Sequence, residues 1–306
     1  MNSIETLPAS GPEGLEEMKL VLAESAPLTL QWAQEGCWHD PSKSMSCAWY
    51  HGAWQTLRLL GIVATLTQQA ELYISALRPL IASGDFKRVF LSGSADYGLL
   101  SVILDAFNQE GVVPSITVVD RCATPLRLCR WYAERYGYGI ETVQSDLAAF
   151  RSDAPYDLIC VHSLLSCVPR KNHADIVATW HNLLRPGGTL MMANNVYPGL
   201  TGKKTGFSAE QISAYRERVM TAARECPFKD ALPPDAEIEK IATTYATHME
   251  GTVISSRSQL TDILEAQGFA LQETRFGDLV KNPDHQRSGA PVDNKKEYAW
   301  IVARRI

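Results

Sequence analysis

The sequence has no CxxC pair, although it contains seven cysteines among its 306 residues. The cysteines are scattered and odd in number, which disfavours both a disulfide framework and a zinc site made of thiolates. We therefore expect free thiols that pack as small apolar side chains.

The chain also lacks a long apolar run and a positively charged start followed by an apolar segment. A helix that crosses a bilayer needs about 20 predominantly apolar residues, and a secretory signal needs the charged start. We expect a soluble, cytoplasmic protein that has no membrane partner.

Neither sign of charge is concentrated in the chain. Lys and Arg number 29 against 34 Asp and Glu, and no block rich in Lys and Arg occurs. Because proteins that follow nucleic-acid phosphates usually carry a basic face, we expect no nucleic-acid partner. With 45% hydrophobic residues, the chain has enough apolar material for a globular core.

Residues 1–84 have a helical pattern. Between residues 46 and 60, apolar side chains recur at the spacing of one helix face: Trp49, Ala53, Leu57 and Leu60. A second helix is expected over 67–81. Tyr50, His51 and Trp54 lie away from the centre of the apolar face, so they are candidates for a pocket wall.

From residue 85 onward, short apolar strands alternate with helices, which predicts a parallel sheet covered on both faces. The expected strands are 88–91, 116–119, 140–143, 156–161, 189–193, 270–274 and 298–303. The expected helices are 99–108, 124–136, 172–184 and 258–267. Residues 198–251 interrupt the alternation with two helices, the first beginning at a capping-box pattern from Ser208 to Gln211. A long loop is expected over 277–296.

Ligands of such sheets bind beyond the carboxyl ends of the strands. The turn after the first strand places Gly93, Ala95 and Gly98 there, and Asp120 ends the second strand. Small residues let a ligand approach the backbone, and a carboxylate can accept hydrogen bonds from both hydroxyls of a ribose. Together they predict a nucleoside site.

Two further features resemble class I S-adenosylmethionine-dependent methyltransferases: Ser145-Asp146 after the third strand, and the LLRPGG turn (183–188) before the fifth. The resemblance covers about residues 85–306. It implies a doubly wound α/β fold whose mostly parallel seven-stranded sheet has an antiparallel last strand. It further implies that residues 1–84 form a helical lid, that S-adenosylmethionine is the cofactor, and that a small molecule is the acceptor.

The resemblance also assigns cofactor contacts. It places the methionine and ribose part at the turn after the first strand (Ser92, Gly93, Ser94, Ala95). Asp120 with its neighbour Arg121 would hold the ribose, and Asp146 with Leu147 the adenine. Ser92 stands where the family usually has a carboxylate, and Ala95 replaces a glycine.

His162 follows the fourth strand and lies where the methyl group should be transferred, with an ordinary pKa suited to base catalysis near neutrality. Further catalytic candidates are Tyr50 and His51. Substrate contacts are expected from Tyr50, Trp54, Asn194 and Tyr197. The strand ends carry His162-Ser163 and Asn194-Asn195 in place of carboxylates, so we predict no metal.

Three alternatives stay open. The acceptor atom could be oxygen, nitrogen or carbon, perhaps of a secondary metabolite. The Gly-rich turn would also serve a nicotinamide-dependent oxidoreductase. A protein of methyltransferase fold could also have lost its chemistry, or could form a homodimer.

Overall fold

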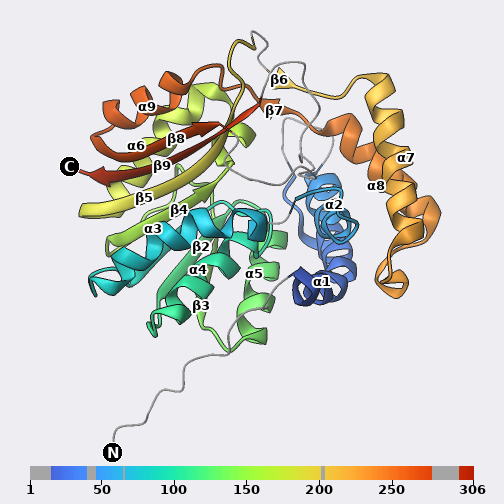
Figure 1. Ribbon diagram of the computed structural model, residues 1–306, viewed down its shortest axis with the longest axis horizontal. Coiled ribbons are helices and arrows are strands. Elements are labelled where there is room, and N and C mark those ends of the chain that lie inside the picture. Colours follow the sequence, from blue (N-terminus) through green and yellow to red (C-terminus); the bar gives the residue numbers. More distant parts are fainter. Residues whose placement is uncertain (1–14, 40–45, 65, 201–203, 278–295) are drawn as a thin grey trace, which may run out of the picture.

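The computed structural model describes residues 15–39, 46–64, 66–200, 204–277 and 296–306. Its centre is a seven-stranded sheet of order β3-β2-β1-β4-β5-β9-β8 (Figure 1). The strands are β1 (Arg88–Ser92), β2 (Ser115–Asp120), β3 (Ile140–Gln144), β4 (Tyr156–His162), β5 (Leu184–Val196), β8 (Phe269–Gly277) and β9 (Glu297–Arg305). β9 runs antiparallel to both of its neighbours, whereas the pairs from β3 to β5 are parallel. The predicted sheet and its antiparallel last strand are confirmed.

Helices cover both faces of this sheet (Figure 1). One face carries α3 (Ala70–Ala82), α4 (Gly98–Gln109) and α5 (Ala123–Arg135), and the other carries α6 (His173–Leu183) and α9 (Arg257–Ala266). The apolar helix α4 is enclosed between the sheet and α3, as its composition predicts.

The remaining helices form a cover beside the sheet. α1 (Leu15–Gly36) packs along α2 (Ala48–Leu59), and α2 contacts α8 (Asp235–His248), which pairs with α7 (Ala209–Glu225). In Figure 1, α1 and α2 lie between the sheet and the insertion helices α7 and α8. Among the described residues, none of the helices combines the length and apolar character that a membrane crossing requires.

Short elements complete the fold: η1 (Leu66–Gln69), η2 (Leu164–Cys167), η3 (Arg170–Asn172), η4 (Lys229–Ala231), β6 (Lys204–Thr205) and β7 (Gly251–Thr252). β6 and β7 pair at the base of the insertion, and the sequence pattern did not predict them. Most of the expected loop over 277–296 lies outside the described residues.

The turn predicted over 183–188 is partly wrong. Its last residues belong to β5, which pairs with β4 first at Leu184 and again only from Thr189, so the segment between them bulges out of the sheet. Gly187 has a φ of 75°, a conformation that favours glycine. The Pro-Gly-Gly signal thus marks a bulge within a strand.

The first helix of the insertion, α7, begins with the capping box that the sequence predicts. Ser208 Oγ accepts a hydrogen bond from the Gln211 N–H at 3.2 Å, and Gln211 Oε1 accepts one from the Ser208 N–H at 2.8 Å, which confirms the capping box. Ser208→Ala should lower the free energy of unfolding by about 1 kcal/mol in urea denaturation. Ser213→Ala, at an exposed position in the same helix, should cause no loss. Equal stabilities of the two variants would contradict the capping role.

Candidate active site

Asp120 joins two loops at the carboxyl edge of the sheet. Its Oδ2 accepts a hydrogen bond from the Ser94 N–H at 2.9 Å, and its Oδ1 accepts one from the Cys122 N–H at 2.7 Å. A carboxylate has about four acceptor sites, so each oxygen keeps one for a ribose hydroxyl. Burial raises the pKa of Asp120 above its ordinary value. The residue therefore fits the ribose-binding role that the sequence predicts.

The turn after β1 requires glycine at its first position. Gly93 has a φ of 71°, and a Cβ there would lie 2.9 Å from Leu164 Cδ1. Two residues further on, Ala95 is only partly buried. Gly93 is thus required by the backbone conformation and by Leu164, and the close approach of a ligand stays a prediction.

A buried ion pair that the sequence did not predict fixes this turn. Arg58 of α2 donates to Asp96 Oδ2, and the two side chains are only 9% and 4% exposed. Asp96 Oδ1 also accepts a hydrogen bond from the Gly98 N–H at 2.7 Å. Removing one partner of a buried pair typically costs about 3–5 kcal/mol. The pair thus attaches α2 firmly to the predicted cofactor loop.

Ser92 contributes to the core through its side chain. Its Oγ accepts a hydrogen bond from Trp180 Nε1 of α6 at 2.8 Å, and Ser92 is fully buried. Side chains alternate along a strand, and Ser92 shares the parity of Phe90, which packs on the α6 side. The Ser92 hydroxyl is thus engaged with α6, and the cofactor contact expected of Ser92, which stays a prediction, would come from its backbone.

Arg121 and Asp146, both expected at the cofactor, bind each other. Arg121 Nη2 lies 2.8 Å from Asp146 Oδ2, and both side chains are about half exposed, at 49% and 51%. Asp146 Oδ1 accepts a hydrogen bond from the Ala148 N–H at 2.9 Å, and Leu147 is partly buried. Exposed pairs contribute little to stability, so a ligand can replace this one at small cost.

His162 is held by Tyr73 of α3. His162 Nδ1 lies 3.1 Å from Tyr73 Oη, and Tyr73 donates its own proton to the Val161 carbonyl at 3.0 Å. This assigns the imidazole proton to Nδ1, which donates to Tyr73, and leaves the lone pair on Nε2. Nε2 is thus an acceptor.

The ordinary pKa expected for His162 is wrong. Burial lowers the pKa of His162 to about 3, and the positive charges of Arg58 and Lys296 act in the same direction. The imidazole is neutral at physiological pH, and it is a weaker base than the sequence suggested.

Tyr50 and Trp54 belong to an aromatic stack between α2 and the insertion. Their ring centroids are 4.8 Å apart, and Tyr50 stacks on Tyr245 of α8, which stacks on Tyr215 of α7. Burial raises the pKa of Tyr50 well above its ordinary value, so its hydroxyl keeps its proton. Trp54 Nε1 is buried and has no hydrogen-bond partner within the described part of the chain. Both side chains suit a wall with polar donors.

Successive side chains near the end of β5 point to opposite faces of the sheet. Asn194 Nδ2 donates to Ser166 Oγ at 3.1 Å, and Tyr197 is nearly buried. Ala193 is the pairing partner of His162, so Asn195, two residues later, shares its face. The buried Oδ1 atoms of Asn194 and Asn195 both lack a hydrogen-bond partner in the described ranges. Because only Asn195 shares the face of His162, we prefer it to Asn194 as a substrate contact, and strand alternation in the sequence could have indicated this.

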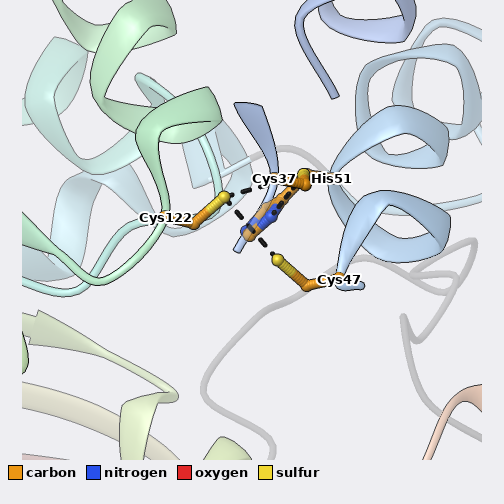
Figure 2. A group of neighbouring side chains, drawn as sticks. All are labelled: Cys37, Cys47, His51 and Cys122. Atoms are coloured by element: carbon orange, nitrogen blue, oxygen red, sulfur yellow. Dashed lines mark hydrogen bonds between the residues drawn. The ribbon is translucent and has the colours of Figure 1, made fainter. Parts of the chain in front are cut away.

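His51 lies beside Tyr50, with ring centroids 5.1 Å apart. It forms a cluster with Cys37, Cys47 and Cys122, and its Nδ1 is 3.6 Å from Cys37 Sγ (Figure 2). The catalytic role expected for His51 stays a prediction. Three cysteines that are scattered in the sequence are brought together here by the fold.

Comparison with known proteins finds methyltransferases. A family model described as a methyltransferase domain matches residues 101–188. The search of curated proteins found no match. A solved structure of geranyl diphosphate methyltransferase in complex with S-adenosylmethionine is 13% identical, with 87% of this chain and 93% of that chain covered and a TM-score of 0.51.

Two other structures are similar at lower TM-scores. Magnesium protoporphyrin IX methyltransferase from Synechocystis PCC 6803 is 13% identical over 78% of this chain and 84% of that chain, with a TM-score of 0.46. An S-adenosylmethionine-dependent methyltransferase from Methanosarcina mazei is 16% identical over 74% and 97%, with a TM-score of 0.45. The family match covers residues 101–188 of the core, and the fold is similar to that of the solved methyltransferase with a TM-score of 0.51.

The placement of Ser92 can be tested directly. Ser92→Ala leaves the buried Trp180 Nε1 without an acceptor, so it should lower the free energy of unfolding by about 1–3 kcal/mol. Affinity for S-adenosylmethionine, measured by calorimetry, should not change. The matched change Trp180→Phe removes the other partner, and the double variant should be less than additive. A tenfold loss of affinity in a fully stable Ser92→Ala protein would place the hydroxyl in the site after all.

Proposed function

We propose that this protein transfers a methyl group to an oxygen, nitrogen or carbon atom of a small apolar or aromatic acceptor. The supporting observation is that the stacked aromatic side chains of α2, α7 and α8 lie near the residues at the carboxyl ends of the strands. Tyr50 lies against Trp54 with ring centroids 4.8 Å apart, and Arg58, whose guanidinium carbon is 5.2 Å from the Trp54 ring centroid, pairs with Asp96 of the loop after β1. Such an acceptor suits secondary metabolism.

The cofactor of this family, S-adenosylmethionine, supplies a methyl group on a sulfonium sulfur. We assign the ribose hydroxyls to the free acceptor sites of Asp120. The backbone from Gly93 to Ala95 would contact the methionine and ribose part, and Asp146 and Leu147 would contact the adenine. The Arg58–Asp96 pair holds the loop after β1 in shape. Positioning of the cofactor by this loop would therefore supply much of the rate of methyl transfer.

His162 would position the acceptor. A neutral imidazole with its lone pair on Nε2 can accept a hydrogen bond from a hydroxyl or an amine of the acceptor. Its low pKa makes it a poor group for removing a proton in advance. The acceptor is therefore expected to be nucleophilic without prior ionisation, as an amine or an electron-rich carbon is.

We propose that α1 and α2, but not α3, form the lid expected of residues 1–84. α1 and α2 form the cover together with α7 and α8, whereas α3 packs on α4 and supports His162 through Tyr73. The cover would exclude water from the transfer.

Binding and turnover together test the function. The protein is incubated with S-adenosylmethionine and a panel of aromatic amines, phenols and enols, and products are examined by mass spectrometry for one added methyl group. Cofactor binding with no product from any acceptor class would favour the non-catalytic alternative. Binding of NADH in place of S-adenosylmethionine would favour the oxidoreductase.

Asp120→Ala should weaken S-adenosylmethionine binding at least about tenfold, because hydrogen bonds to a charged acceptor contribute about 1.5–3 kcal/mol. Asp153→Ala, at an exposed position, serves as the control and should bind normally. Calorimetry with S-adenosylmethionine and S-adenosylhomocysteine measures both proteins. Unchanged affinity in a folded Asp120→Ala protein would remove Asp120 from the site.

His162 should make stability depend on pH. In the unfolded chain its pKa is about 6.5, whereas in the folded protein burial lowers it to about 3. As the pH falls below about 6.5, only the unfolded state takes up this proton, so stability is lost. Between pH 7.5 and pH 5 the loss from this residue should be about 2 kcal/mol.

Urea denaturation of the wild type and of His162→Asn at both pH values measures this effect. The variant should lose about 2 kcal/mol less on acidification than the wild type. Equal losses in the two proteins would show that the imidazole titrates normally.

A further inference from the structure

Three cysteines and a histidine meet in one cluster outside the predicted methyl-transfer site (Figure 2). Cys37 follows α1, Cys47 precedes α2, His51 lies in the first turn of α2, and Cys122 precedes α5. One possible ligand atom of each residue lies within 4.8 Å of all the others. Figure 2 shows the side chains approaching one another from these separate segments.

The separations within the cluster are those of a tetrahedral metal site. Cys122 Sγ lies 3.6 Å from Cys37 Sγ and 3.6 Å from Cys47 Sγ, and Cys37 Sγ lies 3.6 Å from His51 Nδ1. With zinc–sulfur bonds of about 2.3 Å, the corners of a tetrahedron are about 3.7 Å apart. A disulfide would need sulfurs about 2.05 Å apart. The observed spacing therefore matches four ligands around one ion.

A divalent ion would bind the cysteines as thiolates and His51 as a neutral imidazole, so the protons of these groups would be released on binding.

The backbone around the cluster is organised to hold it. The Cys47 N–H donates to the Trp38 carbonyl at 3.1 Å, and His39 pairs with Ser46, so the two ends of the loop between α1 and α2 are fixed together. Cys47 and His51 are four residues apart and share one side of the first turn of α2.

Side chains outside the cluster support it as well. Thr124 Oγ1 lies 3.3 Å from both Cys37 Sγ and the Trp32 carbonyl oxygen, so its hydroxyl can hydrogen-bond to either, and a bond to sulfur is of the kind that orients metal ligands. Cys122 and His51 are buried, whereas Cys37 and Cys47 are partly buried. The protein thus provides a partly buried site with an outer contact.

We propose that Cys37, Cys47, His51 and Cys122 bind a structural zinc ion. Four protein ligands leave no open position, which distinguishes a structural from a catalytic zinc site. The ion would fasten α1 and α2 to the start of α5. Because Cys122 also donates its N–H to Asp120, the site would stabilise the loop on which the ribose is expected to rest.

Metal analysis of the purified full-length protein tests the proposal. The protein is prepared with a phosphine reductant and no chelator, and zinc is measured by plasma mass spectrometry. We expect about one zinc per chain. Cys122→Ser and Cys47→Ser should each lose at least about tenfold in zinc affinity. Cys167→Ser, which changes an exposed cysteine outside the cluster, should keep the full zinc content.

Two measurements on the unaltered chain keep the test decisive if the cluster variants fold poorly. Cobalt(II) added to the zinc-depleted protein should give the intense visible bands of tetrahedral thiolate coordination. Hydrogen exchange should show that chelation loosens α2 and the start of α5 more than α4. Neither readout depends on methyl transfer, so this proposal can fail while the proposed function stands.

Three outcomes would overturn the proposal. The reduced protein could contain no zinc and bind no cobalt. It could instead contain a disulfide between Cys122 and either Cys37 or Cys47. Such a disulfide would have to resist the reductant that is present before the metal is added. Or Cys167→Ser could lose as much zinc as Cys122→Ser.

Discussion

The carboxylate of Asp120 is the contact on which the site depends. It accepts the N–H of Ser94 from the loop after β1 and the N–H of Cys122 from the loop after β2, which fixes the distance between those loops. From Ser94 the chain continues to Asp96 and its buried partner Arg58 in α2. From Cys122 it continues to the cysteine cluster at the other end of α2. One strand-end carboxylate thus sets the position of the helix that covers it.

Much of the fold could be predicted because its signals are local. Strand and helix periodicity located the core elements, and the capping box at Ser208 located α7. The site was predicted less well, since its properties come from contacts distant in sequence. The low pKa of His162 comes from burial first and then from the charges of Arg58 and Lys296. The cysteine cluster joins residue 122 to residues 37–51 without any motif spacing. Ser92 differs, because strand alternation relative to Phe90 already predicts its inward orientation.

The parts of the chain that would choose the acceptor lie outside the part that the family model recognises. The matched segment, residues 101–188, contains Asp120, Asp146 and His162. The aromatic stack of Tyr50, Tyr215 and Tyr245 lies on α2, α7 and α8, before and after that segment. Under the proposed function, the matched core would bind the cofactor and the cover would select the acceptor. Similarity to known methyltransferases would then carry little information on the acceptor.

The attachments of the cover differ in strength, which bears on how an acceptor enters. α2 is held to the core by the buried Arg58–Asp96 ion pair and by the cluster at its first turn. The insertion helices meet α2 through stacked rings, and their base is closed by the two-residue strands β6 and β7. Stacked aromatic pairs contribute about 0.5–1.5 kcal/mol beyond their burial, far less than the disruption of a buried ion pair costs. Separation of α8 from α2 is therefore the less costly opening, and it would expose Tyr50 and Trp54 while the cofactor loops keep their shape.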